Sequence, residues 1–356
     1  NISVKDNIYN NSENNKLLSS FEKYVNEEKK DRYIVSLSGG VDSMVVASIL
    51  CYLGKEVIGC HINYNNRSET KEEQEFLEEW CGYNNIKLYV KEINNYKRGE
   101  VKRSNYEVYT REIRFNFYKE VLEKEKLDCI LLGHHKDDIV ENIVANVCRG
   151  RNLLDLAVIK DKNVINGVLM SRPMINFYKL DVYDFAHKNS IPYFKDTTPE
   201  WSVRGKYRNE LEGKLEYTFG NNLKENLLGL SMQSFEWNSL IMREMIEPFL
   251  EKVIYNENGV EFNIDNYVNY PLCFWNIIFA KLFYRYGYNC PSRKGIRTFM
   301  NSIPGINKAS LSDSCVCKIV NNKVNIVFIN NNNVINKDVY IGVGPKRLVT
   351  IIGALF

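Results

Sequence analysis

The sequence predicts a doubly wound α/β domain with a mostly parallel sheet, followed by a helical region and a small β-rich C-terminal region. Two observations predict the first domain. Short apolar runs alternate with helical patterns from residue 33 to residue 133, and the motifs rich in glycine and charge follow the apolar runs. In such a sheet, ligands bind beyond the carboxyl ends of the strands. We therefore expect the functional site at that edge.

The expected strands of this domain are 33–37, 57–62, 87–93 and 128–133. One helix is expected directly after Asp42, one over 69–81 and one over 105–124. The last carries apolar residues on one face, at positions 109, 113, 117 and 121. Strands joined through helices in this way are parallel neighbours with crossover connections.

The remaining chain gives the expected domain limits. A polar lead-in covers 1–30, the α/β domain covers 31–208, and a helical and aromatic region covers 209–302. The β-rich region at 303–356 has strand-like runs at 315–320, 323–329 and 338–343.

Composition narrows the class of protein. The 356 residues include 47 basic and 44 acidic ones, so the net charge of +3 permits an anionic partner without requiring one. Nine cysteines without a C-x-x-C pair argue against a disulfide scaffold or a four-cysteine zinc ribbon and fit a reducing compartment. The sequence contains no stretch of about 18 apolar residues, so it predicts no membrane span. We expect a cytoplasmic protein, with an organellar location as the alternative if a transit peptide preceded Asn1.

A phosphate-binding loop is predicted between the first strand and the first helix. It consists of Ser38, Gly39, Gly40, Val41, Asp42 and Ser43. The glycines let the backbone approach an anion, the serines add hydroxyl donors, and the helix N-terminus offers unpaired N–H groups. A carboxylate repels phosphate unless a cation lies between them, so Asp42 implies Mg²⁺ bound between protein and nucleotide. An ordinary capped glycine turn is the alternative.

A second polar cluster follows the predicted strand 128–133. It contains His134, His135, Asp137, Asp138 and Glu141. Asp137 and Glu141 are four residues apart, so on a helix they share a face and can hold a cation or an amine together. Adjacent helical residues point in different directions. We therefore expect one histidine to contact nucleotide or substrate while the other packs or caps.

Arg111 and Arg114 lie on the preceding predicted helix and can face the same way. A solvated charged face explains the pair equally well. Their position just before the strand that leads to His134 favours a functional Arg114.

Seven segments together resemble the tRNA(Ile)-lysidine synthetase family of the PP-loop ATP pyrophosphatase superfamily. They are SLSGGVDS, HINYNNR, REIRF, LLGHHKDDIVEN, RGRNLLDLAVIK, SRPM and IPYFKDTTPEWSVRGKYRN, in this order. The resemblance implies an enzyme that uses ATP and Mg²⁺ to adenylate C2 of the wobble cytidine of a CAU-anticodon tRNA(Ile). Free lysine then replaces AMP to give lysidine.

The resemblance also implies residue roles. The loop from Ser38 to Ser43 and His61 would bind Mg·ATP, and His134 would lie near the reacting phosphate. The lysine and cytidine site would be formed by Arg114, Asp137, Asp138 and Glu141. Its acids would hold an ammonium group, and its arginine would balance developing negative charge. Asp42, Arg114, His134, Asp137 and Glu141 would be catalytic, with Asp42 as the metal ligand.

The segment 196–209 combines basic and aromatic residues, which suits phosphate contacts and base stacking. The expected tRNA contacts are Arg149, Arg151, Trp201, Arg204, Lys206 and Arg208. A packed tryptophan with solvated charges is the alternative. A homodimer is compatible with the sequence.

Three departures from the family pattern bear on the RNA substrate. Asn63 stands where the family has an acid, Asn142 stands where it has threonine, and Thr198 and Pro199 stand where it has Ser-Asn. Three other readings remain open: a tRNA thiolase with the same adenylation step, an amidating ligase such as NAD or GMP synthetase, and a non-catalytic RNA-binding relic. The absence of C-x-x-C pairs weighs against sulfur transfer, and the intact acids weigh against a relic.

Overall fold

The computed structural model describes residues 8, 15–66, 69–94, 103–156, 159–194, 202–303 and 309–329, without the side chains of 103–105 and 107. The chain divides into two compact units. The described residues of the first fall within 1–150 and 156–231, and those of the second within 151–155 and 232–352. Each unit has its own hydrophobic core.

The first unit contains a six-stranded sheet in the order β3-β2-β1-β4-β6-β5. Its strands are β1 (Arg32–Ser36), β2 (Glu56–Asn63), β3 (Lys87–Glu92), β4 (Cys129–Leu131), β5 (Lys162–Ile165) and β6 (Val168–Ser171). All neighbours are parallel except β5 and β6. These two form a hairpin through Asn166 and Gly167, which both have positive φ as a tight hairpin turn requires. The predicted mostly parallel sheet is confirmed.

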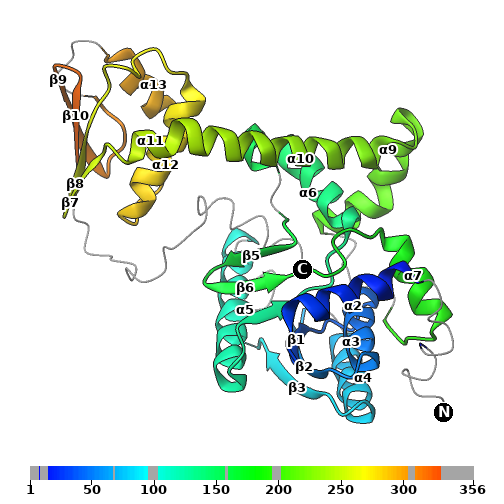
Figure 1. Cartoon of the computed structure of the whole chain (residues 1–356). Coiled ribbons are helices and arrows are strands. Elements are labelled where there is room, and N and C mark those ends of the chain that lie inside the picture. Colours follow the sequence, from blue (N-terminus) through cyan, green and yellow to red (C-terminus); the bar gives the residue numbers. More distant parts are fainter. Residues whose placement is uncertain are drawn as a thin grey trace. The chain divides into compact units, whose positions relative to one another are not determined.

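Helices cover both faces of this sheet (Figure 1). They are α2 (Lys16–Glu28), α3 (Val41–Tyr52), α4 (Thr70–Tyr83), α5 (Arg103–Glu125), α6 (Lys136–Cys148) and α7 (Lys179–Lys188). The core on one face combines buried side chains of α2, α3, α4 and α7, while α5 packs along β2, β4 and β6. Helices on both faces make the domain doubly wound, which is the predicted class.

The predicted polar lead-in contains a helix that the sequence pattern did not reveal. Asn15 caps α2 by accepting hydrogen bonds from the backbone N–H groups of Leu17 and Leu18. Leu17, Leu18, Phe21 and Val25 form its buried stripe. The spacing of these four residues is that of an amphipathic helix, so this part of the lead-in belongs to the core of the first unit.

Further helices follow in chain order. They are η1 (Leu153–Asp155), α8 (Val203–Lys206), the π-helical turn η2 (Tyr207–Leu211), α9 (Glu212–Phe219), α10 (Leu223–Ile241), the π-helical turn η3 (Met242–Ile246) and α11 (Glu247–Leu250). The two units divide within α10. The expected domain limits at 208/209 and 302/303 do not coincide with this division. They stay predictions.

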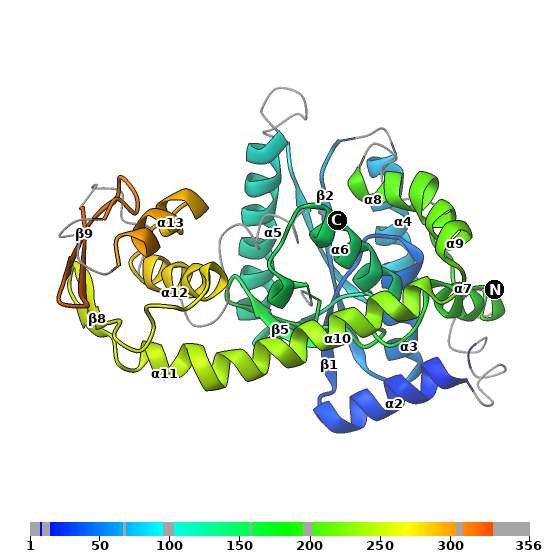
Figure 2. The ribbon, with the colours of Figure 1, turned by 90° about the horizontal axis from the view of Figure 1, so that it is seen from above.

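The second unit has a four-stranded antiparallel sheet in the order β7-β8-β10-β9. Its elements are β7 (Ile254–Asn256), β8 (Gly259–Asn263), α12 (Leu272–Arg285), α13 (Arg293–Asn301), β9 (Cys315–Val320) and β10 (Lys323–Phe328). Figure 2 shows α12 and α13 beside this sheet, and aromatic side chains around Trp275 fill the space between them. The strands predicted at 315–320 and 323–329 are present, and 338–343 lies outside the described residues.

All nine cysteines lie in the described residues and carry free thiols. Within the same residues, no helix combines the length and the hydrophobicity that crossing a membrane requires.

Candidate active site

The predicted phosphate loop joins β1 to α3 at the carboxyl edge of the sheet. Gly39 has φ +80°, a left-handed conformation that favours glycine. The hydroxyl of Ser43 donates to the carbonyl of Gly40 (3.0 Å) and accepts from the backbone N–H of Ser38 (3.1 Å). Gly40 precedes α3 and provides no side-chain cap for its first turn. The first N–H groups of α3 can therefore bind an anion.

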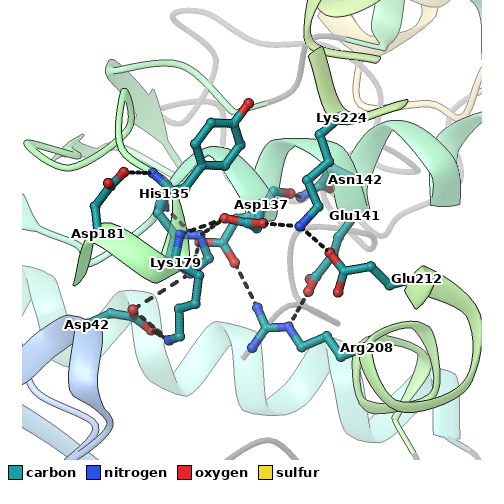
Figure 3. A network of polar contacts seen from close by, with 12 residues as sticks. Asp42, His135, Asp137, Glu141, Asn142, Lys179, Asp181, Arg208, Glu212 and Lys224 are labelled. Carbon is teal, nitrogen blue, oxygen red and sulfur yellow. Dashed lines mark hydrogen bonds and ion pairs between the residues drawn. The ribbon is translucent and has the colours of Figure 1, made fainter. Parts of the chain in front are cut away.

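Asp42 lies in the first turn of α3 and contacts a lysine (Figure 3). Lys179, the first residue of α7, places its Nζ 2.7 and 2.6 Å from the two carboxylate oxygens. Nε2 of His135 lies 3.7 Å from the same carboxylate. Burial raises the pKa of Asp42, but Lys179 and His135 bring it below its usual value. Asp42 is therefore ionised at neutral pH, with Lys179 as its counterion.

The second polar cluster lies at the start of α6. His135 caps this helix, and its backbone N–H donates to Oδ2 of Asp138 (2.9 Å). The His135 ring is fully buried and lies 3.5 Å from both Asp137 and Asp138. Burial lowers the pKa of this histidine. His135 thus occupies the N-cap position, and the side chain of Asp138 satisfies its backbone N–H.

Asp137 bridges two basic segments of the chain (Figure 3). Its Oδ2 accepts from the backbone N–H of Lys179 (2.7 Å), and its Oδ1 accepts from Nζ of Lys224 (2.8 Å). Nζ of Lys224 also contacts Glu212 (2.8 Å) and Glu216 (3.3 Å). Burial opposes ionisation of Asp137, but His135 and Lys224 bring its pKa well below the usual range. A lysine ammonium thus lies among three carboxylates.

Asp138 and Glu141 share two arginines. Nε of Arg204 lies 2.7 Å from Oε2 of Glu141, and its Nη2 contacts Asp138. Arg208 contacts Glu141 through Nε and Asp138 through Nη2 (3.2 Å). Burial raises the pKa of Glu141 to about 7 against the opposing effect of Arg208, and burial lowers the pKa of Arg204 to about 9. Both arginines are protonated at neutral pH.

Arg111 and Arg114 are buried side chains of α5 and do not form a solvated face. Nε of Arg114 donates to the hydroxyl of Tyr64 (2.9 Å), which follows the carboxyl end of β2. The Arg111 guanidinium lies 4.8 Å from the ring centre of Phe115. Burial lowers the pKa of Arg111 to about 10, and its cationic neighbour Arg114 adds to this effect.

The two other candidate histidines are buried. Nδ1 of His61, on β2, lies 2.9 Å from the carbonyl of Leu37, so it is protonated and donates, and Nε2 is an acceptor. Nδ1 of His134 lies 2.8 Å from Nε of Arg172. Burial lowers the pKa of both rings, that of His134 most strongly. Both are therefore neutral at pH 7.

The positions that depart from the family pattern have local structural partners. Asn63 donates to Gln74 (2.8 Å) and accepts from the backbone N–H of Asn65 (2.9 Å). Asn142 donates to the carbonyl of Asp138 one helical turn earlier (3.0 Å). Thr198 and Pro199 lie outside the described residues.

A family model described as the PP-loop domain matches residues 13–213. The chain belongs to the PP-loop family. This membership implies that it binds ATP. Among curated relatives, the tRNA(Ile)-lysidine synthase of Mycoplasmopsis pulmonis is 35% identical over 184 residues, which cover 51% of this chain and 62% of that protein. The tRNA(Ile)-lysidine synthase of Chlamydia felis is 29% identical over 228 residues, or 64% and 71%.

One solved structure is a more distant likeness. The U34-tRNA thiolase NcsA from Methanococcus maripaludis has a TM-score of 0.49 and 18% sequence identity, covering 65% of this chain and 80% of that one. It is too distant to bear on function. This chain spans 62% of the length of the M. pulmonis relative.

The structure of this PP-loop protein brings most of the predicted site residues together. Asp42 from the loop lies beside His135, and Asp137, Asp138 and Glu141 follow on α6. The predicted tRNA contacts differ in their surroundings: Arg149 and Lys206 are exposed, Arg204 and Arg208 contact the acids, and Arg151 belongs to the second unit. Trp201 lies outside the described residues.

Sequence reasoning missed three basic residues of this site, which are Arg172, Lys179 and Lys224. Arg172 lies in the SRPM segment, so the resemblance contained a signal for it. Lys179 pairs with an acid 137 residues earlier, and Lys224 pairs with one 87 residues earlier. A local sequence pattern cannot predict ion pairs between residues that are so far apart in the chain.

Proposed function

We propose that this PP-loop protein is an ATP-dependent tRNA-modifying ligase that joins free lysine to C2 of the wobble cytidine of a CAU-anticodon tRNA. The observation that carries the proposal is the set of carboxylates beside the phosphate loop. Asp137 already holds an alkylammonium group, that of Lys224, at 2.8 Å. The reaction is suggested by the relatives from M. pulmonis and C. felis, which are named tRNA(Ile)-lysidine synthase.

ATP binding at the loop would place its phosphates at the N-terminus of α3. Mg²⁺ fits this site, because Asp42 is an ionised oxygen donor, and Mg²⁺ in proteins is commonly held by one or two carboxylates together with substrate phosphates. No group of three or more acidic, histidine or cysteine side chains in the described part of the chain forms a ready-made metal cage. Asp42 would help to hold Mg²⁺, which when bound would neutralise phosphate charge; Lys179 is the present counterion of Asp42.

The acids of α6 would bind the amine substrate. Lysine attacks only as a free amine, so the site needs an ammonium-binding group that can also accept a proton. Glu141 suits this role, since burial raises its pKa to about 7. Arg114, which lies on α5, would face the negative charge that develops during the reaction.

The RNA would be recognised by basic residues near the carboxyl edge of the six-stranded sheet. Arg149 and Lys206 are exposed and can contact phosphates. Arg204 and Arg208 can do so only if they leave Asp138 and Glu141. The tRNA identity, a homodimer and a cytoplasmic location stay predictions.

The test is incorporation of labelled lysine into a synthetic CAU-anticodon tRNA(Ile) in the presence of Mg·ATP. We expect one lysine on the wobble cytidine, with stoichiometric AMP and pyrophosphate. The matched control is the same tRNA with a uridine at the wobble position, which should take up no lysine. The Asp137→Asn and Glu141→Gln variants should need about ten- to hundredfold more lysine, since each loses a charge-assisted contact of about 1.5 to 3 kcal/mol.

Other outcomes separate the alternatives. AMP release that depends on tRNA but not on lysine would overturn the choice of nucleophile and point to another base-adenylating enzyme, such as a thiolase. A protein that binds tRNA without hydrolysing ATP would be the non-catalytic relic.

A further inference from the structure

His134 and Arg172 follow two adjacent strands at the carboxyl edge of the sheet. β4 and β6 are parallel neighbours with Leu131 opposite Ser171, so the chain segments that leave them lie side by side. Nε of Arg172 lies 2.8 Å from Nδ1 of His134. Both residues are nearly inaccessible, with 3% and 4% of their surface exposed. The contact therefore forms in the protein interior, where hydrogen bonds are not exchanged for water.

This contact determines where the His134 proton lies. A guanidinium has five N–H donors and no acceptor, so Nδ1 of His134 must accept with its lone pair. A neutral imidazole then carries its single proton on Nε2. Protonating Nδ1 would place two donors against each other.

The surroundings of His134 also oppose a charged ring. After burial itself, the groups with the largest effect on the ring are Arg172 after β6, Arg204 from α8, the neighbouring His135 and Arg114 from α5. Three of these four are arginines, which disfavour a second positive charge nearby. Together with burial, they hold the pKa of His134 well below its usual value.

Arg172 is itself held rigidly. Its Nη1 donates to the carbonyl of Lys160 and to Oδ1 of Asn163, both at 2.7 Å. Its backbone N–H donates to the carbonyl of Asp161 (2.8 Å). Two contacts of Nη1 thus orient the guanidinium, and the backbone hydrogen bond holds the residue that carries it beside the segment around β5.

We infer that Arg172 is a positioning residue that keeps His134 neutral and makes it a hydrogen-bond donor through Nε2. His134 follows Gly133, whose Cα lies against Asp42: an added Cβ would be 2.8 Å from the Asp42 Cβ. The backbone that carries His134 therefore lies beside the phosphate loop. A neutral donor stabilises charge on an oxygen without giving up its proton.

The inference rests on the proposed adenylation. In that step the cytidine C2 oxygen forms a new bond to the α-phosphorus, and the α–β bridging oxygen leaves with pyrophosphate. The positive charge stays on the cytidine ring, and the step needs no proton from the protein. His134 would only donate its Nε2–H to a phosphate oxygen whose charge increases.

The decisive measurement is ¹⁵N NMR of the histidine side chains in the ligand-free full chain between pH 6 and 8.5. The chain has four histidines, and the signals that disappear in His134→Gln assign the one in question. We expect wild-type His134 to be the Nε2–H tautomer over the whole range. An Nδ1–H tautomer or an imidazolium would overturn the inference, whatever the outcome of the lysine assay.

Variants of Arg172 test its role. Arg172→Met should release His134, so that its tautomers mix and the ring titrates closer to its usual pKa. Arg172→Lys keeps a cationic donor and should restore the Nε2–H tautomer at least in part. The control is Arg243→Met, which removes an exposed arginine of the second unit and should leave the His134 signals unchanged. Unchanged signals in a folded Arg172→Met variant would refute the role of Arg172.

Pyrophosphate release from ATP and tRNA gives the second readout. The terminal amide of a glutamine can donate from about the position of Nε2. His134→Gln should therefore keep more activity than His134→Ala, by about tenfold or more, since one lost donor to a developing oxyanion costs about 10²–10³ in rate. Equal losses in the two variants would contradict a donor role.

Discussion

The buried pair Glu141–Arg204 should be energetically coupled, and a double-mutant cycle measures this. Nε of Arg204 lies 2.7 Å from Oε2 of Glu141, and only 12% and 4% of the two side chains are exposed. Two charges about 4 Å apart interact by about 4 kcal/mol at an effective dielectric constant of 20. Each partner keeps a second ion pair, Arg204 with Asp138 and Glu141 with Arg208. We therefore expect about 2 to 3 kcal/mol of destabilisation for each single variant.

The cycle consists of wild type, Glu141→Gln, Arg204→Met and the double variant. Unfolding by urea is followed by circular dichroism at pH 8, above the pKa of about 7 that burial gives Glu141. The double variant should lose about 2 kcal/mol less unfolding free energy than the two single variants lose together. The reason is that each single variant leaves the charge of the other partner uncompensated. In thermal unfolding, each single variant should lose about 4 to 12 °C.

An exposed ion pair provides the matched control. Lys71 and Glu75 are 3.5 Å apart on α4, with 83% and 62% of their side chains exposed. The cycle of Lys71→Met and Glu75→Gln should give a coupling energy below about 0.5 kcal/mol. A coupling energy between Glu141 and Arg204 that is no larger than the coupling energy of this surface pair would refute the charge pairing described for the site.

Four further outcomes are expected. Asp42→Asn should abolish pyrophosphate release without changing the circular dichroism spectrum; exchange of labelled pyrophosphate into ATP at the wild-type rate would contradict this. Gly133→Ala should lower the rate of pyrophosphate release at least tenfold, because its Cβ would lie 2.8 Å from the Asp42 Cβ; unchanged kinetics would show that the loop adapts. The KM for lysine should rise as pH falls through about 7, where Glu141 takes up a proton, and a flat profile would exclude Glu141 from amine binding. Glu125→Gln should cost about 1.5 to 3 kcal/mol at pH 7 in urea unfolding, since its carboxylate contacts Arg32 and Lys87. Hydrogen bonds from Lys87, Tyr89 and Arg32 lower the pKa of Glu125 from 4.5 to about 2, so the wild type should lose this advantage as pH falls from 4.5 to 2.

The sequence predicted those parts of the fold that depend on local patterns. The four strands β1 to β4 follow from apolar runs of five to seven residues, and the loop with Asp42 follows from its position after the first of them. The hairpin of β5 and β6 was missed, because these strands have only four residues each and mixed burial. Helix α2 was missed because Asn-rich surroundings concealed four apolar residues at helical spacing.

The site was predictable only in part, for a physical reason. Parallel strands bring their carboxyl ends together, so the neighbourhood of Asp42 and the α6 acids could be inferred from order along the chain. The counterions could not. Lys179, Arg204, Arg208 and Lys224 come from a later segment, and the partner of each depends on how that segment folds back over the loop.

The four acids Asp42, Asp137, Asp138 and Glu141 each contact a basic side chain from the segment 179–224. A cationic substrate entering this site would exchange with a resident cation, and the total charge of the interior would stay the same. Attraction between opposite charges then contributes little to the choice of substrate, because the departing cation had the same attraction. Discrimination between amines would depend on length and hydrogen-bond geometry. A buried site built in this way resembles a selective ion exchanger, in which shape decides which cation stays.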